Sequence, residues 1–295
     1  MRELGIDIET YSSEDLTSCG VYRYAEAEDF TVLLFAYSVD NGEVDCIDLA
    51  GGERLPDDIR EALTDPAVVK TAYNAAFERV CLSRWLGLPE GEYLDPSQWK
   101  CTMIRAARLG LPLSLASCGD ALGITEGKMK EGAALIRYFS MPGRDGRRHL
   151  PADAPDKWEV FKSYCKRDVG VEQAILARVR ALPVPAFDER LYIADQEIND
   201  RGVLIDRRLV ENAVRFDDEY KAELLQEARE ISGLGNPNSP AQLKQWISDT
   251  TKFPVTTLNR NSLDELEANL RYYPKVQRLL ALRRLLELTI IGSEI

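Results

Sequence analysis

The chain has 295 residues, of which 45% are hydrophobic, and its formal net charge is −12 at pH 7. This length and apolar content are sufficient for a buried core and predict about two domains. The acidic balance argues against broad, non-specific binding to duplex DNA, and no apolar run reaches the about 18 residues of a membrane span.

The first part of the chain predicts strands followed by helices around a strand–helix unit. Asn41-Gly42 is a strong hairpin signal between two strands, and the apolar strand Val68–Tyr73 precedes a helix. The expected strands are 4–9, 21–24, 32–39, 44–48 and 68–73, and the expected helices are 56–63, 76–85, 102–106, 115–122, 132–139 and 157–179. This order predicts a mixed α/β domain.

A proline-rich segment separates this part from a nearly all-helical second part. Two prolines in Leu182-Pro183-Val184-Pro185 break a helix, so we expect domains at 1–183 and 187–295. The expected elements of the second part are helices 187–200, 207–231, 240–248, 262–270 and 273–288, with a short strand at 203–205.

The N-terminus and the cysteines predict a reducing compartment. The N-terminus lacks the apolar stretch of a signal peptide, so we expect a cytoplasmic protein without membrane contact. The six cysteines are scattered without a C-x-x-C pair, and His149 is the single histidine, which argues against a zinc finger. We therefore expect six reduced thiols.

Two carboxylates lie close together on the first strand. Strand alternation places Asp7 and Glu9 on one face, with Ile6 and Ile8 on the other. Such carboxylates repel each other unless a cation binds them, and hard oxygen ligands suit Mg²⁺ or Mn²⁺. For this dipeptide pattern alone, a solvated acidic face is the more frequent explanation.

Two later motifs each add a carboxylate. Asn74 and Glu78 stand where a strand passes into a helix, and capping and the helix dipole explain them equally well. Tyr164 and Asp168 are four residues apart and share one helix face. Taken separately, a core tyrosine and a surface aspartate also explain this pair.

In combination, the order Asp-x-Glu, Asn-x-x-Phe-acid and Tyr-x-x-x-Asp resembles the DEDD exonuclease superfamily, whose members have a ribonuclease H-like fold. The tyrosine of the third motif is similar to that of the DEDDy subgroup. Cys101-Thr102-Met103-Ile104 and Ser114-Leu115-Ala116 resemble the family A DNA polymerase version, with phage and prophage polymerases closest. The resemblance implies a proofreading 3′→5′ exonuclease that hydrolyses single-stranded DNA 3′ ends in a bacterial host cytoplasm.

The resemblance continues past the expected domain boundary. Asp195–Asp206 looks like the entry into the polymerase region, and Asn236–Leu243 looks like the start of its thumb. No fingers and no palm carboxylates follow before Ile295. We therefore expect a partial palm-entry and thumb region that does not synthesise DNA by itself, with the missing polymerase portion as a possible partner.

The resemblance also implies a two-metal site for Mg²⁺ or Mn²⁺. It places Asp7 between both metals, with Glu9 and Asp168 completing one metal site. Tyr164 would orient the attacking water. Glu78 would act on the second metal through water, and it departs from the family pattern because the usual acid is aspartate.

Further residues are expected to contact the DNA strand. Thr10, Asn74 and Phe77 occupy positions that resemble contacts to the terminal nucleotides, although core packing explains Phe77 as well. Met141–Ala154 is expected to be an exposed loop, in which Arg147 and Arg148 either touch the phosphate backbone or are simply solvated.

Two other functions remain open at this stage. The chain can be a non-catalytic platform of the polymerase, in which Glu78 reflects the loss of a catalytic acid. Metal titration distinguishes this case, because a platform should bind metal weakly and without catalysis. Alternatively, the chain is an RNA exonuclease that resembles ribonuclease D. The thumb-like segment argues against the RNA exonuclease, and competition between DNA and RNA oligonucleotides tests it.

Overall fold

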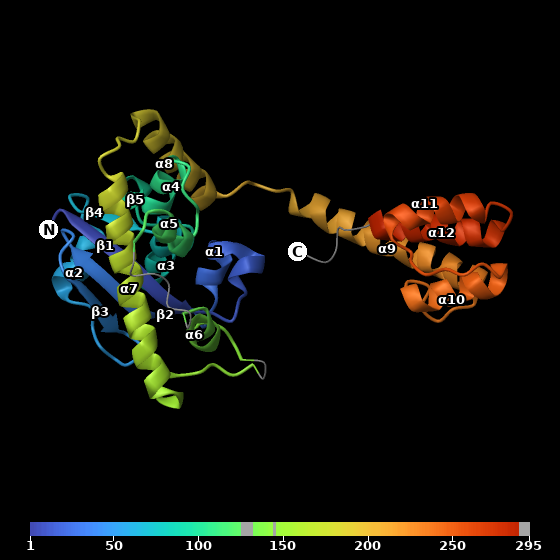
Figure 1. The fold of residues 1–295 in the computed structure, drawn as a ribbon, viewed down its shortest axis with the longest axis horizontal. Helices are drawn as coiled ribbons and strands as arrows, with labels where there is room; N and C mark the ends of the chain where they lie inside the picture. Colours follow the sequence, from blue (N-terminus) through green and yellow to red (C-terminus); the bar gives the residue numbers. More distant parts are fainter. Residues whose placement is uncertain (125–131, 144–145, 289–295) are drawn as a thin grey trace. The chain divides into compact units, whose positions relative to one another are not determined.

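The computed structural model describes residues 1–124, 132–143 and 146–288 (Figure 1). Residues 144–145 of the expected loop and 289–295 of the expected second domain lie outside the described residues. The chain forms two compact units, Met1–Val203 and Leu204–Ile295.

A five-stranded sheet forms the centre of the first unit (Figure 1). The central strand is β1 (Glu3–Tyr11), and the strand order is β3-β2-β1-β4-β5. β2 (Thr31–Val39) pairs antiparallel with β1 and with β3 (Val44–Asp48). β4 (Val69–Ala72) runs parallel to β1, and β5 (Trp99–Cys101) runs parallel to β4. This mixed sheet with flanking helices is the predicted ribonuclease H-like fold.

One face of the sheet packs against the helices α1 (Leu16–Glu26), α2 (Asp57–Ala62) and α3 (Ala75–Trp85). Ile6 and Ile8 of β1 are buried in this core, as strand alternation predicted. Strand alternation therefore places Ile6 and Ile8 on this face and leaves the other face to Asp7 and Glu9.

The other face packs against α6 (Gly132–Phe139) and the long α7 (Pro155–Val179). α7 begins at a proline, which is favoured at the first helical position because it needs no hydrogen-bond partner there. α4 (Thr102–Ala107) and α5 (Leu115–Ala121) pack against α7. Short 3₁₀ turns cover Pro96–Gln98 and Pro151–Asp153.

The predicted hairpin between β2 and β3 is confirmed. Asp40 and Asn41 both have positive φ, at 52° and 59°, and the N–H of Gly42 donates to the carbonyl of Val39 at 2.8 Å. Asparagine and aspartate tolerate this backbone region better than most residues, which explains why the turn forms here.

The expected strand at Val21–Tyr24 is wrong, because this segment is the second half of α1. The Asp15 side chain accepts a hydrogen bond from the N–H of Thr17 and begins the helix. Gly20 (φ 75°) produces a kink, after which the helix continues. The β-branched and aromatic residues pack against α3 and the sheet instead of forming a ladder.

The unit boundary lies later than the expected one, because α8 (Ala186–Arg201) belongs to the first unit. The Arg79 side chain, 1% exposed, makes two hydrogen bonds of 2.8 and 2.6 Å to the carboxylate of Asp200. Tyr22 donates to the same carboxylate at 2.8 Å. These buried contacts attach α8 to the first unit, although α8 was predicted to belong to the second domain.

The second unit is helical, as predicted. Its helices are α9 (Arg207–Ser232), α10 (Pro240–Thr251), α11 (Arg260–Asn269) and α12 (Pro274–Leu288). The side chains of Asp206 and Ser239 accept hydrogen bonds from backbone N–H groups and begin α9 and α10. Leucines fill the core between these helices.

The expected strand at Val203–Ile205 is absent. The structure assigns this segment no secondary structure, and its side chains are 81%, 98% and 61% exposed. Its β-branched composition favours a strand, but a strand requires a neighbour to pair with. Within the described part of the chain, no helix is both long and apolar enough to cross a bilayer.

Candidate active site

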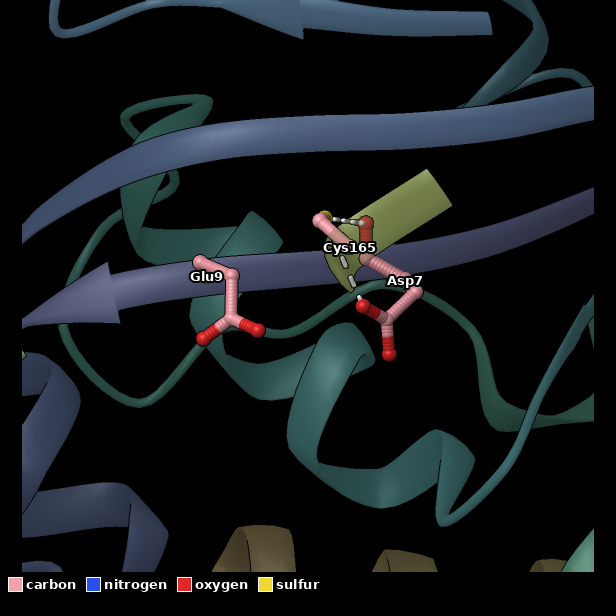
Figure 2. Close-up of side chains that lie close together, drawn as sticks. All are labelled: Asp7, Glu9 and Cys165. Atoms are coloured by element: carbon pink, nitrogen blue, oxygen red, sulfur yellow. Dashed lines mark hydrogen bonds between the residues drawn. The ribbon is translucent and has the colours of Figure 1, made fainter. Parts of the chain in front are cut away.

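The central strand presents two carboxylates on the face that α7 covers. Asp7 is partly exposed and Glu9 is 8% exposed, and both point away from the core that holds Ile6 and Ile8 (Figure 2). A register shift with β2 occurs between Glu9 and Thr10. The sheet therefore fixes two acidic side chains next to each other near the end of its central strand.

The second motif brings Glu78 to the same place. β4 ends at Ala72, and α3 begins three residues later after Asn74 in a left-handed conformation (φ 78°). Glu78, in the first turn of α3, is 4% exposed, and its Oε2 is buried without a hydrogen-bond partner among the described residues. An unpartnered buried carboxylate oxygen is costly, so this atom is a candidate ligand for a cation.

The third motif completes the cluster from α7. Tyr164 and Asp168 lie one turn apart on α7, and the Asp168 carboxylate acts electrostatically on the Tyr164 hydroxyl. The first residue of α6 fits closely against the tyrosine ring: a Cβ added at Gly132 would lie 2.3 Å from Cε2 of Tyr164. The absence of a side chain at Gly132 therefore permits this position of Tyr164.

The acids interact electrostatically across the three elements. Burial, and secondarily the Asp168 carboxylate, raise the pKa of Asp7 well above its usual value. Burial and the Asp7 and Asp168 carboxylates raise the pKa of Glu9 in the same way. Burial and Asp7 raise the pKa of Glu78. Four carboxylates thus lie near enough to disfavour one another's ionisation.

This electrostatic arrangement fits a divalent cation. A bound cation would offset both the burial and the mutual repulsion of the acids, and it would partner the unsatisfied oxygen of Glu78. Ligand atoms of Asp7, Glu9 and Cys165 all lie within 4.8 Å of one another. The oxygen-rich donor set suits a hard cation such as Mg²⁺ or Mn²⁺.

The predicted substrate-contact residues have different environments. The Thr10 hydroxyl is buried and hydrogen-bonded to the Tyr24 hydroxyl at 2.8 Å. Asn74 is exposed, and its side chain makes no capping hydrogen bond to α3. The alternative explanation, that the Asn74 side chain caps the helix, is therefore wrong. Phe77 is partly buried and packs at the edge of the α1–α3 core. The centroids of the Phe77 and Tyr24 rings are 6.2 Å apart.

Sequence analysis missed two residues beside the carboxylates. The Cys165 thiol donates weakly to Asp7, at 3.5 Å to Oδ2 and 3.7 Å to the backbone oxygen (Figure 2). All six cysteines are free thiols, as expected. The second residue, Glu172, is buried, and it accepts a hydrogen bond from Thr102. Glu172 follows Asp168 by four residues, so the sequence could have placed both on one face of the helix. The sequence could not have predicted its contact with Thr102 of α4.

The environment of Glu172 shifts its ionisation. Burial raises the pKa of Glu172 to about 7, although the hydrogen bond from Thr102 lowers it. Glu172 also contributes to the raised pKa of Asp7 and of Glu78. The site therefore contains a fifth acid behind the four that the motifs identified.

Comparisons with known proteins confirm the predicted resemblance to a phage DNA polymerase. No protein-family model matches the chain. The DNA polymerase of Bacillus phage SP02 is 46% identical over 290 residues, which cover 96% of this chain and 44% of the phage protein. The chain thus spans less than half the length of this relative.

Solved structures share the fold at low sequence identity. The polymerase domain of Pol1 from M. smegmatis, solved with DNA primer-template and dNTP, is 17% identical with a TM-score of 0.52, and the match covers 98% of this chain and 45% of that chain. RNase D of Escherichia coli, an exoribonuclease, is 17% identical with a TM-score of 0.44 over 97% of this chain and 70% of that chain.

Proposed function

We propose, from the relationship of this chain to part of a phage DNA polymerase, that it is a divalent-metal-dependent 3′→5′ exonuclease that hydrolyses single-stranded DNA ends. The observation that carries this proposal is the convergence of Asp7, Glu9, Glu78 and Asp168 from three separate elements onto one cluster, in which Glu9 and Glu78 are buried. Structural proteins rarely gather four acids so closely, because each raises the cost of ionising its neighbours.

The four acids are the proposed ligands for Mg²⁺ or Mn²⁺. By the family resemblance, Asp7, Glu9 and Asp168 would hold the metal ions, and Glu78 would act on them through water. When bound, the metal ions would acidify a water and stabilise charge on the phosphate. Cys165, through its hydrogen bonds to Asp7, supports the orientation of that carboxylate.

Tyr164 is proposed to orient the attacking water. Burial and the neighbouring carboxylates, Asp168 first, raise the pKa of the Tyr164 hydroxyl above its usual value. The side chain therefore stays a neutral phenol at neutral pH and can donate or accept a hydrogen bond, but it does not serve as the base.

The terminal nucleotides are proposed to contact the surface beside α3. Asn74 is exposed with its side chain open to a partner, and Phe77 is partly exposed, so that a base can stack on the accessible part of its ring. For Thr10, the side-chain hydroxyl is occupied by Tyr24, so a nucleotide contact there would use its backbone or displace that bond.

The relationship to the phage polymerase supports a proofreading role within a longer protein. On this proposal the second unit corresponds to part of a polymerase region, and the remaining polymerase portion is its partner. The work of such an enzyme would take place in a bacterial host cytoplasm.

The test is nucleotide release from 3′-labelled single-stranded DNA with Mg²⁺ or Mn²⁺, comparing the wild type with Asp7→Ala. We expect at least about a thousandfold loss, equivalent to roughly 4 kcal/mol of transition-state stabilisation. Asp45→Ala is the matched control, because Asp45 is an exposed aspartate on β3 whose strand partner, Tyr37, belongs to the opposite core. Mn²⁺ titration followed by calorimetry should show binding to the wild type and to the control, and weakened binding to Asp7→Ala.

Three results would contradict the proposal in different ways. Equal release by the wild type and Asp7→Ala would show that the activity arises elsewhere. A wild type that neither binds Mn²⁺ nor cleaves DNA would favour the non-catalytic platform. A stronger preference for RNA in direct competition would favour the ribonuclease D-like alternative.

A further inference from the structure

A row of cationic and aromatic side chains leads away from the carboxylates. We name it the cationic strip, and its members come from β1, α6, the following loop and α7: Tyr11, Tyr138, Arg148, His149 and Lys157.

The strip begins two residues after Glu9 on the central strand. The Arg148 guanidinium lies 4.4 Å from the centroid of the Tyr11 ring. Its Nε is buried without a hydrogen-bond partner, and no carboxylate within the described ranges forms an ion pair with it. Arg148 therefore lies against the Tyr11 ring beside the site, and no carboxylate among the described residues neutralises its charge.

The strip continues through the neighbouring residue of the loop. The His149 ring stacks on Tyr138 with centroids 4.0 Å apart and an interplanar angle of 10°. The Lys157 Nζ lies 4.2 Å from the centroid of the same tyrosine ring. A hollow of about 370 Å³ adjoins this stack, and Tyr138, Lys157 and Val160 contribute to its wall.

The direction of the strip follows one side of α7. Lys157 and Tyr164 are seven residues apart, which is nearly two helical turns, so they share a side of the helix at roughly 10 Å of axial distance. Stacked DNA advances about 3.4 Å per nucleotide along one strand, so this distance corresponds to roughly three nucleotides. A strand whose 3′ end lies at Tyr164 would thus reach Lys157 with its next few nucleotides.

The local charge is the reverse of the chain's overall charge. The net charge of the protein is −12, yet this surface presents Arg148 and Lys157 on aromatic rings. Among the described residues, Asp156 lines the hollow and Asp29 acts on Tyr11. Guanidinium and ammonium groups that rings hold in place are suited to single-stranded nucleic acid, because they can contact its phosphates.

We propose that the cationic strip binds the nucleotides of single-stranded DNA that precede the cleaved 3′ end. This inference rests on the proposed exonuclease function and extends it, because it assigns a path for the strand outside the carboxylate cluster. Arg148 and Lys157 contact phosphates, and the Tyr11 and Tyr138 rings hold these two cations in place.

The test measures the affinity of the full chain for DNA in EDTA, where no cleavage occurs, by fluorescence anisotropy. The variant is Arg148→Ala combined with Lys157→Ala, and the probes are an oligonucleotide of about eight nucleotides, within the usual site size, and a dinucleotide. We expect roughly tenfold weaker binding of the longer probe and unchanged binding of the dinucleotide. The slope of log affinity against log salt should fall by about 0.7 for each lost phosphate contact.

Two variants serve as controls for the position and the charge of the cations, and a stability measurement is the control for folding. Arg54→Ala removes an exposed cation that precedes α2, and it should bind as the wild type does. Arg148→Lys keeps the charge and should retain most of the salt dependence. Thermal unfolding of each variant shows whether the loss of a ring contact has altered the fold.

Each outcome decides between the proposals. If the wild type cleaves DNA and the double variant binds both probes with wild-type affinity and salt dependence, the strip is refuted and the exonuclease stands. Equal losses for the dinucleotide and the longer probe would also refute it, because the two cations would then act at the 3′ end. If the wild type neither binds nor cleaves single-stranded DNA, the proposed function fails and the strip loses its substrate.

Discussion

The two compact units bury different kinds of side chain. In the first unit, the core contains charged residues, namely Glu9, Asp48, Lys70, Glu78, Arg79 and Glu172. In the second, Thr251 is the buried polar residue within the described part, and the core consists mainly of leucines. Burying a charge costs free energy unless a partner or ligand compensates it, so the first unit is where chemistry is expected.

The buried charges of the first unit are themselves of two kinds. Arg79 and Lys70 are satisfied by protein groups: Arg79 by Asp200, and Lys70 by two backbone carbonyls and Gln98. Glu9 and Glu78 instead face other acids. Satisfied charges hold the structure together, whereas mutually repelling acids favour the binding of a compensating charge, such as a cation.

The largest effect on stability is expected from Arg79→Ala. Removing one partner of a buried pair leaves Asp200 uncompensated, so we expect a loss of about 3–5 kcal/mol in the free energy of unfolding of the first unit. Urea unfolding in a Trp246→Phe background measures it, because the remaining tryptophans, Trp85, Trp99 and Trp158, all lie in the first unit.

The second unit offers a matched control for this prediction. Arg278 also makes two hydrogen bonds to one carboxylate, 2.6 and 2.8 Å to Glu227, but its side chain is 51% exposed. Arg278→Ala should therefore change the unfolding of the second unit very little. Equal destabilisation by the two substitutions would show that burial does not distinguish the pairs.

A leucine deletion should affect the second unit alone. Leu280 is fully buried in its core, and Leu280→Ala should cost about 3 kcal/mol through lost apolar burial and a residual cavity. Nuclease activity of the first unit should remain within twofold or so of the wild type. Fluorescence of Trp246, which packs against the same core, reports the unfolding. A parallel loss of nuclease activity would mean that the two units depend on each other.

The free energy of unfolding of the first unit should depend on pH more strongly than that of the second unit. The folded pKa of Glu172 is raised to about 7 from an ordinary value of 4.5, so its favourable contribution is present below about 4.5 and is lost as pH rises through about 7. The raised pKa values of Asp7, Glu9 and Glu78 act with the same sign.

In EDTA, the first unit should therefore lose stability as pH rises across this window. The contribution of Glu172 is up to about 3 kcal/mol, since each pKa unit is worth about 1.4 kcal/mol. Glu172→Gln should flatten the slope, and the unfolding of the second unit should change less over the same range. A slope that Glu172→Gln leaves unchanged would argue against the raised pKa.

The smallest expected effect is that of Glu78→Asp on DNA cleavage. The substitution keeps the carboxylate and restores the acid usual for the resembled family, so we expect a rate within about tenfold of the wild type, or roughly 1.4 kcal/mol. Glu78→Gln keeps the length and removes the charge, and it should lose more. If aspartate costs as much as glutamine, the longer side chain is required for this site.

Much of the fold follows from local pattern. Alternation on β1 separates Ile6 and Ile8 from Asp7 and Glu9, and the helices of the second part follow their predicted ranges closely. The exceptions are segments whose state depends on neighbours. Val21–Tyr24 has the composition of a strand but packs as a helix, and Val203–Ile205 has that composition without a strand to pair with.

The sequence by itself determined the acids, their order and the elements that carry them, because side-chain periodicity and turn residues act over a few residues. Only the tertiary structure decided which groups meet across the chain. Cys165 lies against Asp7, Glu172 against Thr102, and Arg79 against Asp200. Such contacts depend on how α7, α4 and α8 pack on the sheet, and packing is set by the shape of the whole core, which no local pattern encodes.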